Sequence, residues 1–87
     1  MRIDKNKWQI GDIIYEASTS YKKVKKFEIT NIWIENYLSG PKTIVRLYEL
    51  DPKTGDILWT TTKFMSDVIH YYDTPEEAEA ALAEMLK

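Results

Sequence analysis

A single amphipathic helix pattern stands at the C-terminal end of a chain whose other segments are patterned as strands, and this order leaves few folds open. Between residues 8 and 73, short runs rich in β-branched and aromatic residues alternate with turn residues. Such side chains suit a pleated, half-buried surface. The glycines are isolated, at positions 11, 40 and 55, where turns between strands are expected. The order predicts a mainly β protein that ends in a helix.

Five strands are expected from these runs. The first follows a Gly-Asp turn and alternates through Ile13 to Ser18. The next three lie within 21–38, 43–50 and 57–64, and a brief fifth strand covers 68–72. The loop "DPKTGD" is the clearest hairpin signal, because Pro52 suits an early turn position and Gly55 a left-handed one.

The second strand changes its apolar parity midway. Phe27 and Ile29 are at odd positions, whereas Ile32 and Ile34 are at even ones. One extra residue would keep all four side chains on one face, so we expect a bulge or sharp bend near Thr30 and Asn31.

The helix is expected over about 75–86. Thr74 is a favourable N-cap, Pro75 suits the first helical position, and Glu77 can complete a capping box. The apolar stripe that should dock this helix on the sheet consists of Ala78, Ala81, Leu82 and Met85.

The fold class that follows is mainly β (α+β): a five-stranded SH3-like small barrel, or a curled antiparallel meander, with a C-terminal α-helix. The nearest rival is an OB-type barrel, which would place its helix between the third and fourth strands, where the tight "DPKTGD" loop leaves little room. A chain of 87 residues buries only about 60 to 65% of its unfolded surface, so residues 1–87 are expected to form one domain.

Several function classes are disfavoured by what the sequence lacks. There is no cysteine, no signal-peptide pattern and no long apolar run, so we expect a soluble, cytoplasmic protein without a membrane partner. His70 is the only histidine, and no serine lies in a nucleophile motif. We therefore expect no enzyme, no catalytic residue, no metal site and no cofactor.

The sequence "YKKVKKF" is the one charged cluster to weigh. Lysines interleaved with aromatic residues suit a nucleic-acid backbone and its bases, but lysines on an edge strand also prevent sheet-to-sheet aggregation. The net charge of −2 and the acidic helix favour a protein contact over nucleic acid. The candidate binding residues from this cluster are Tyr21, Lys22, Lys23, Lys25 and Lys26.

Aromatic residues make up 13% of the chain, more than so small a fold easily buries. Exposed aromatic side chains are typical anchors of protein interfaces. We expect Trp33 or Trp59 to lie in the core, and Tyr37, Tyr48 and Trp8 to be accessible candidates for binding.

Both ends of the chain carry a resemblance. The opening "IGDIIYEA" is similar to a first strand, and an ending with aromatic-x-T-x-E-E-A-x-x-x-L is formed by Tyr72, Thr74, Glu76, Glu77, Ala78 and Leu82. In these features the chain resembles small uncharacterised bacterial and phage SH3-like barrel proteins. The resemblance implies a barrel-like meander and a phage or mobile-element protein, of a kind in which some members inhibit host defence.

The sequence therefore predicts a non-enzymatic binding module of phage or mobile-element type that binds, and could inhibit, a host protein. The alternative is a nucleic-acid-binding small barrel that uses the patch Lys22–Lys26. The oligomeric state is left open.

Overall fold

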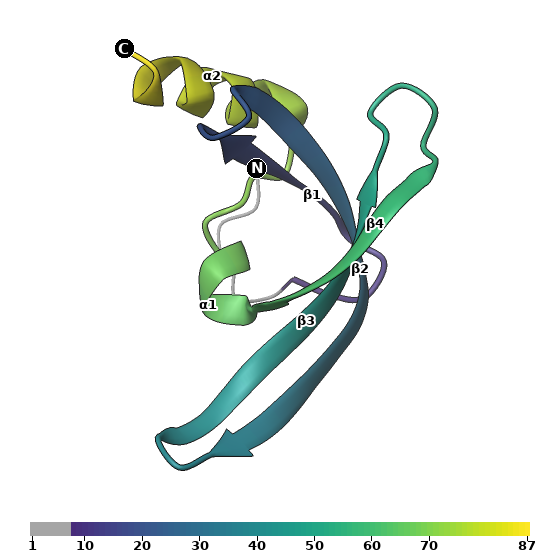
Figure 1. Cartoon of the computed structure of the whole chain (residues 1–87), viewed down its shortest axis with the longest axis vertical. Helices are drawn as coiled ribbons and strands as arrows, with labels where there is room; N and C mark the ends of the chain where they lie inside the picture. Colours follow the sequence, from purple (N-terminus) through teal and green to yellow (C-terminus); the bar gives the residue numbers. More distant parts are fainter. Residues whose placement is uncertain (1–7) are drawn as a thin grey trace.

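Four of the expected strand runs form strands, and they lie in one antiparallel sheet (Figure 1). The computed structural model describes residues 8–87. The strands are β1 (Ile13–Ser18), β2 (Lys23–Tyr37), β3 (Gly40–Leu50) and β4 (Ile57–Phe64). Each pairs with the next along the chain, so the order is β1-β2-β3-β4 and the sheet is open.

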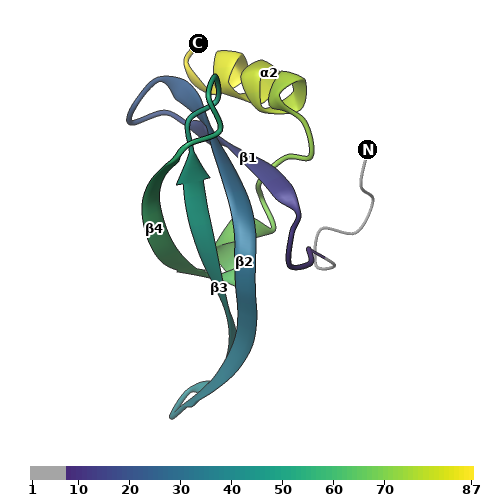
Figure 2. The ribbon, with the colours of Figure 1, turned by 90° about the vertical axis from the view of Figure 1, so that its right-hand side faces the viewer.

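The predicted bulge in β2 is confirmed. Ile29 pairs with Leu47 and Asn31 pairs with Arg46, so Thr30 is the extra residue. Because of it, Phe27 and Ile29 before the bulge and Ile32 after it point to the same side of the sheet. The bulge also accounts for the strong bend that β2 shows beside β3 (Figure 2).

The predicted hairpin at 51–56 is confirmed as well. The Asp51 N–H donates to the Asp56 carbonyl (2.8 Å), and the Asp51 side chain accepts from the Lys53 N–H (2.8 Å). Gly55 has φ of +79°, a conformation that costs a residue with a Cβ 1 to 2 kcal/mol, in rough terms. Turn chemistry alone therefore specifies this connection.

The five-stranded SH3-like barrel and the fifth strand at 68–72 were wrong predictions, whereas the alternative of an antiparallel meander with a C-terminal helix agrees with the order of elements. A short helix, α1 (Met65–Val68), follows β4 directly, and within 68–72 only Tyr72 pairs with a strand, as an isolated bridge to Tyr15. One helical turn directs both Met65 and Val68, three residues apart, toward the core. In a strand, residues three apart point to opposite faces, so only one of the two side chains would reach the core. The burial of both apolar side chains therefore outweighs the strand propensity of this segment.

The C-terminal helix α2 (Pro75–Met85) matches the prediction closely. The Thr74 hydroxyl oxygen accepts from the Glu77 N–H at 3.2 Å, as predicted for the N-cap. The Glu77 carboxylate accepts from the Thr74 hydroxyl at 3.2 Å, whereas the predicted capping box would use the Thr74 backbone N–H. Ala78 and Leu82 are buried where α2 packs across β1 and β2, while Met85 at the end of the stripe is half-exposed. No helix among residues 8–87 is long and apolar enough to span a membrane.

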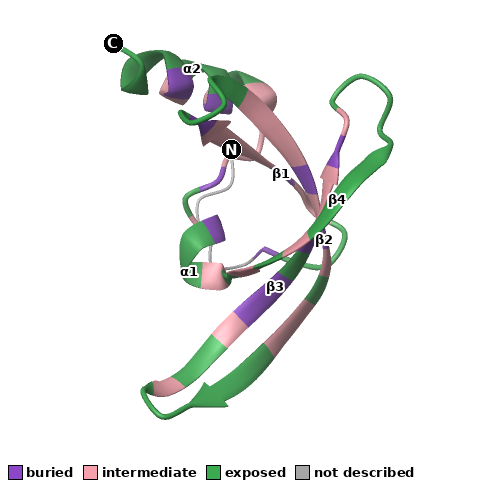
Figure 3. Ribbon diagram, viewed as in Figure 1, coloured by how far each residue is buried: buried purple, intermediate pink, exposed green. Residues whose placement is uncertain are grey.

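The core lies on one side of the sheet, which we call the inner face, and is closed by α1 and the residues that flank it. Its buried members are Trp8, Ile14, Phe27, Ile29, Val45, Leu47, Val68 and Tyr71. The opposite side, the outer face, is covered by α2 only near β1 and the start of β2. The far end of the β2–β3 hairpin (residues 33–44, the distal hairpin) projects beyond both helices and is largely exposed (Figure 3).

Candidate functional site

The distal hairpin carries a cluster of aromatic side chains on the outer face. Trp33 lies opposite Ile44, and Ile44 lies opposite Phe64 on β4, so these three share one face on neighbouring strands. Glu35 and Tyr37 follow Trp33 at spacings of two and four residues, which puts them on the same face. Strand alternation within β2 and the pairing of β2, β3 and β4 therefore bring these five side chains together, and we call them the hairpin cluster.

Glu35 is held in place by its two aromatic neighbours. One carboxylate oxygen accepts from the Trp33 indole N–H at 2.9 Å, and the other accepts from the Tyr37 hydroxyl at 2.9 Å. Both bonds favour the charged form and lower the pKa of Glu35, with the Trp33 bond the larger cause. The same bond to Glu35 raises the pKa of Tyr37. The carboxylate is thus charged and oriented at neutral pH while remaining at the surface.

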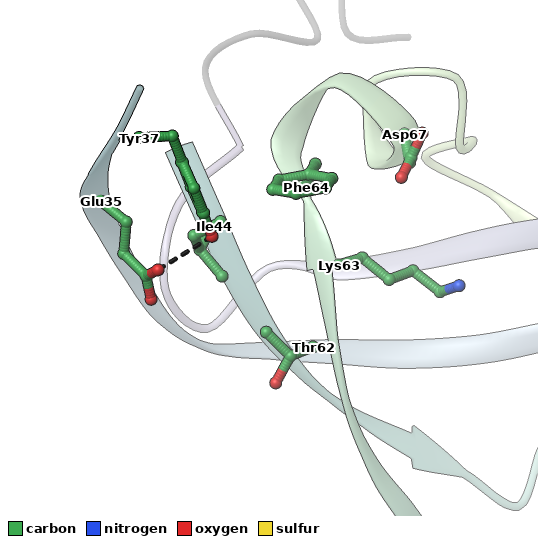
Figure 4. Close-up of a pocket in the computed structure, with 7 residues that line it drawn as sticks. All are labelled: Glu35, Tyr37, Ile44, Thr62, Lys63, Phe64 and Asp67. Atoms are coloured by element: carbon green, nitrogen blue, oxygen red, sulfur yellow. Dashed lines mark hydrogen bonds between the residues drawn. The ribbon is translucent and has the colours of Figure 1, made fainter. Parts of the chain in front are cut away.

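A hollow of about 360 Å³ lies beside this carboxylate (Figure 4). The rings of Tyr37 and Phe64 meet edge to face with centroids 6.3 Å apart, and both side chains are about two-fifths exposed. The residues that line the hollow are Glu35, Tyr37, Ile44, Thr62, Lys63, Phe64 and Asp67. Its walls are apolar rings with a few charged groups, a composition suited to one or two side chains of a partner.

A cation lies on the other side of the cluster. The Arg46 guanidinium sits over the Trp33 ring, 5.6 Å from its centroid. This distance allows a favourable interaction between the cation and the ring face, and it restrains the indole that donates to Glu35. The cluster is therefore ordered by its own contacts before any partner binds.

The predicted lysine patch is divided by the sheet. Lys25 and Lys26 are consecutive residues of β2 and point to opposite faces. Lys25 lies 3.8 Å from Glu49 and 3.9 Å from the centre of the Tyr21 ring, so its charge is already engaged. Lys22 and Lys23 are exposed and line a hollow beside α2. The structure joins Tyr21 to Lys25 but does not gather the four ammonium groups on one surface.

The remaining predicted binding residues have different outcomes. Trp8 was predicted to be accessible, and this is wrong: it is 3% exposed, because its indole N–H donates to the Val68 carbonyl at 3.0 Å within the core. Tyr37 is exposed as predicted, and Tyr48 is half-buried in the middle of β3. Trp59 is 70% exposed and Trp33 is half-buried, so the expectation that one of them lies in the core is also wrong.

Trp33, Glu35 and Phe64 were not predicted as site residues. The signal lay in "WIENY", whose first, third and fifth residues share a strand face and supply an indole donor, a carboxylate and a phenol. Phe64 had no comparable signal, since only the pairing of β4 with β3 places it beside Tyr37.

The described residues hold no candidate metal site. No group of three His, Asp or Glu side chains between residues 8 and 87 is arranged to hold a metal ion. His70 is exposed in the turn after α1, next to a hollow that it shares with Tyr71 and Tyr72.

The fold and the hairpin cluster define a class: a small α+β protein with an open four-stranded antiparallel sheet, a C-terminal helix and an ordered aromatic surface outside its core. Comparison with known protein families, with curated proteins and with solved structures found no match to this chain.

Proposed function

We propose that this protein is a non-enzymatic module that binds another protein through the hairpin cluster. The observation that supports this proposal is the Glu35 carboxylate, oriented by Trp33 and Tyr37 at an exposed position far from the core. A surface ordered before binding loses less conformational entropy when a partner arrives, which favours affinity.

The chemistry of the cluster suggests what the partner presents. An apolar side chain would fill the hollow between Tyr37 and Phe64, and a lysine or arginine beside it would pair with Glu35. A host protein bound by a phage-encoded inhibitor, as the resemblance of the chain's ends implies, would be one instance of this function.

The test places a photo-crosslinking residue at Tyr37, which is 43% exposed, and, as a control, at Tyr21, a more exposed tyrosine (66%) in the β1–β2 turn. We expect one protein to crosslink at position 37 and not at 21. Its affinity for the purified protein, measured by calorimetry, should fall at least about tenfold for Glu35→Arg and Tyr37→Thr, as expected for interface anchors. Tyr21→Thr should leave the affinity unchanged.

Two results would contradict this proposal. If crosslinks formed equally at positions 21 and 37, the hairpin cluster would have no special role. If the captured ligand were an oligonucleotide whose binding survived Glu35→Arg but not Lys22→Gln with Lys23→Gln, the nucleic-acid alternative would replace protein binding.

A further inference from the structure

The two edge strands of the sheet, β1 and β4, differ in whether another segment of the chain pairs with them. At the β1 edge the backbones of Tyr15 and Tyr72 exchange two hydrogen bonds, of 2.9 and 2.8 Å, so the chain itself covers the middle of that edge. Strand β4 forms the other edge and pairs with β3 alone among residues 8–87. An uncovered edge presents unpaired backbone N–H and C=O groups, which can pair with a further strand.

Strand β4 carries little of the protection that such edges usually have. It contains no proline, and its only charged residue is Lys63. Its one irregularity is at Leu58, where the register with β3 shifts, and the segment from Trp59 to Phe64 is regular. Most of this strand is exposed, including Trp59 at 70%.

The side chains of β4 on the two sides of Thr61 complement each other in an antiparallel pairing of two copies. In an antiparallel pair, residues directly opposite each other share a face, so a two-fold pairing must join positions of equal parity. Centred on Thr61, the pairing places Trp59 opposite Lys63 of the second copy and Thr60 opposite Thr62 of the second copy. Leu58 and Phe64 face each other at the ends.

Each of these pairs is favourable. A lysine ammonium over an indole face, a threonine beside a threonine and an aliphatic beside an aromatic side chain are all stabilising cross-strand combinations. The single charge on each strand meets no like charge. Glu49, which lies opposite Trp59 on β3, adds a carboxylate on the same face as the incoming lysine. A centre at Thr60 would instead set Lys63 against Ile57 and Asp56 against Phe64, which is less favourable.

We propose that two copies of this chain pair through β4, antiparallel and centred on Thr61, to form one continuous eight-stranded sheet. The contact is short, well below the roughly 800 Å² per partner of a standard interface. The dimer therefore dissociates on dilution. The proposal is independent of partner binding at the hairpin cluster, although Thr62, Lys63 and Phe64 also line the hollow beside that cluster. The deciding substitutions, at Thr60 and Thr61, lie outside it.

Because the chain has no cysteine, single cysteines report the register directly. Under mild oxidation Thr61→Cys should form a disulfide-linked dimer, since the two copies of residue 61 lie opposite each other. Thr60→Cys should not, because its two copies are offset by two residues and their Cα atoms lie beyond about 7 Å. Trp59→Cys and Lys63→Cys should link in a mixture far faster than either does alone.

Sedimentation of the unmodified protein gives a second measurement. Its average mass should rise toward that of a dimer with increasing concentration. Thr61→Lys should abolish this rise by placing two like charges in contact, whereas Thr54→Lys, in the β3–β4 turn, should leave it unchanged. Circular dichroism confirms that both variants fold.

Three outcomes would overturn the proposal. One is Thr61→Cys linking no faster than Thr54→Cys. Another is faster disulfide formation by Thr60→Cys than by Thr61→Cys, which would exclude a pairing of the two β4 strands centred on Thr61. The third is a mass that stays monomeric at all concentrations, which would leave the β4 edge for a peptide of a different protein.

Discussion

The indole N–H of Trp8 donates a 3.0 Å hydrogen bond to the carbonyl of Val68, 60 residues further along the chain. This buried contact joins the segment before β1 to the short helix that follows β4. It stabilises the helical turn at a place where the local sequence has strand propensity.

Trp8→Phe should therefore destabilise the protein by about 1 to 3 kcal/mol. The hydrogen bond contributes about 1 kcal/mol, and the missing second ring leaves a cavity. The loss is limited because the Val68 carbonyl also accepts from the Tyr71 N–H. Urea denaturation measures the change, and Trp59→Phe, at the exposed edge, is the matched control. Equal effects of the two substitutions would contradict the anchoring role of Trp8.

The docking of α2 should depend on its cap and on one buried leucine. Thr74→Ala should cost about 1 kcal/mol by removing the acceptor for the Glu77 N–H, and Leu82→Ala about 2 to 4 kcal/mol by creating a cavity. Leu86→Ala, at an exposed position beyond the helix, should change the unfolding free energy little. If Leu82→Ala were as mild as Leu86→Ala, α2 would not be packed on the sheet in solution.

Stability should fall as pH rises above about 10, and Tyr71 should contribute to this fall. Burial raises the pKa of its hydroxyl, and the carboxylates of Glu16 and Asp67 add to the effect. Above the ordinary tyrosine pKa the unfolded chain loses this proton and the folded protein keeps it, so unfolding is favoured as pH increases. Denaturation at stepped pH should show a shallower fall for Tyr71→Phe.

Tyr21→Phe, at an exposed tyrosine, should keep the steep fall of the unmodified protein. Part of the slope should persist in Tyr71→Phe, because the pKa of Tyr37 is raised as well. If stability fell equally steeply with pH in Tyr71→Phe and in the unmodified protein, Tyr71 would not contribute to the loss of stability at high pH.

Removing either hydrogen-bond donor to Glu35 should raise the pKa of its carboxyl group, and removing the Trp33 donor should raise it more. Trp33→Phe removes the larger cause of its lowered pKa and should raise that pKa toward the ordinary glutamate value, and Tyr37→Phe should raise it less. Carbon-13 NMR titration of the carboxyl group measures both. Trp59→Phe, on the opposite face, should have no effect, and a larger shift for Tyr37→Phe than for Trp33→Phe would reverse the order of causes.

Nucleic acid should bind weakly, with affinity lost by physiological salt. Four lysines would contribute at most roughly 3.6 to the slope of log affinity against log salt on duplex DNA, at about 0.9 for each phosphate contact. Because Lys25 is engaged with Glu49, we expect a slope below this limit. Fluorescence anisotropy at several salt concentrations tests this, with Lys22→Gln and Lys23→Gln as the variants. Submicromolar binding at physiological salt that these variants abolish would contradict the prediction.

Four of the five strand runs, the hairpin turn at 51–56, the bulge at Thr30 and the N-capped helix were predicted correctly from sequence. Each depends on interactions within a few residues: side-chain alternation, a left-handed glycine, a capping hydroxyl. Interactions of this kind depend only on neighbouring residues, so they can be predicted from the sequence and are kept in the folded protein.

The closure of the sheet and the choice of buried aromatic residues could not be read in this way. The sequence around 68–72 suits a strand, yet Val68 is buried in a helical turn that Trp8 completes from 60 residues away. Trp59 lies in an alternating run like Trp33, and it is exposed on β4, which pairs with β3 alone within residues 8–87. Partner segments distant in sequence set the free energy of burial at each of these positions, and the register that brings Phe64 to Tyr37 exists only once those segments have packed.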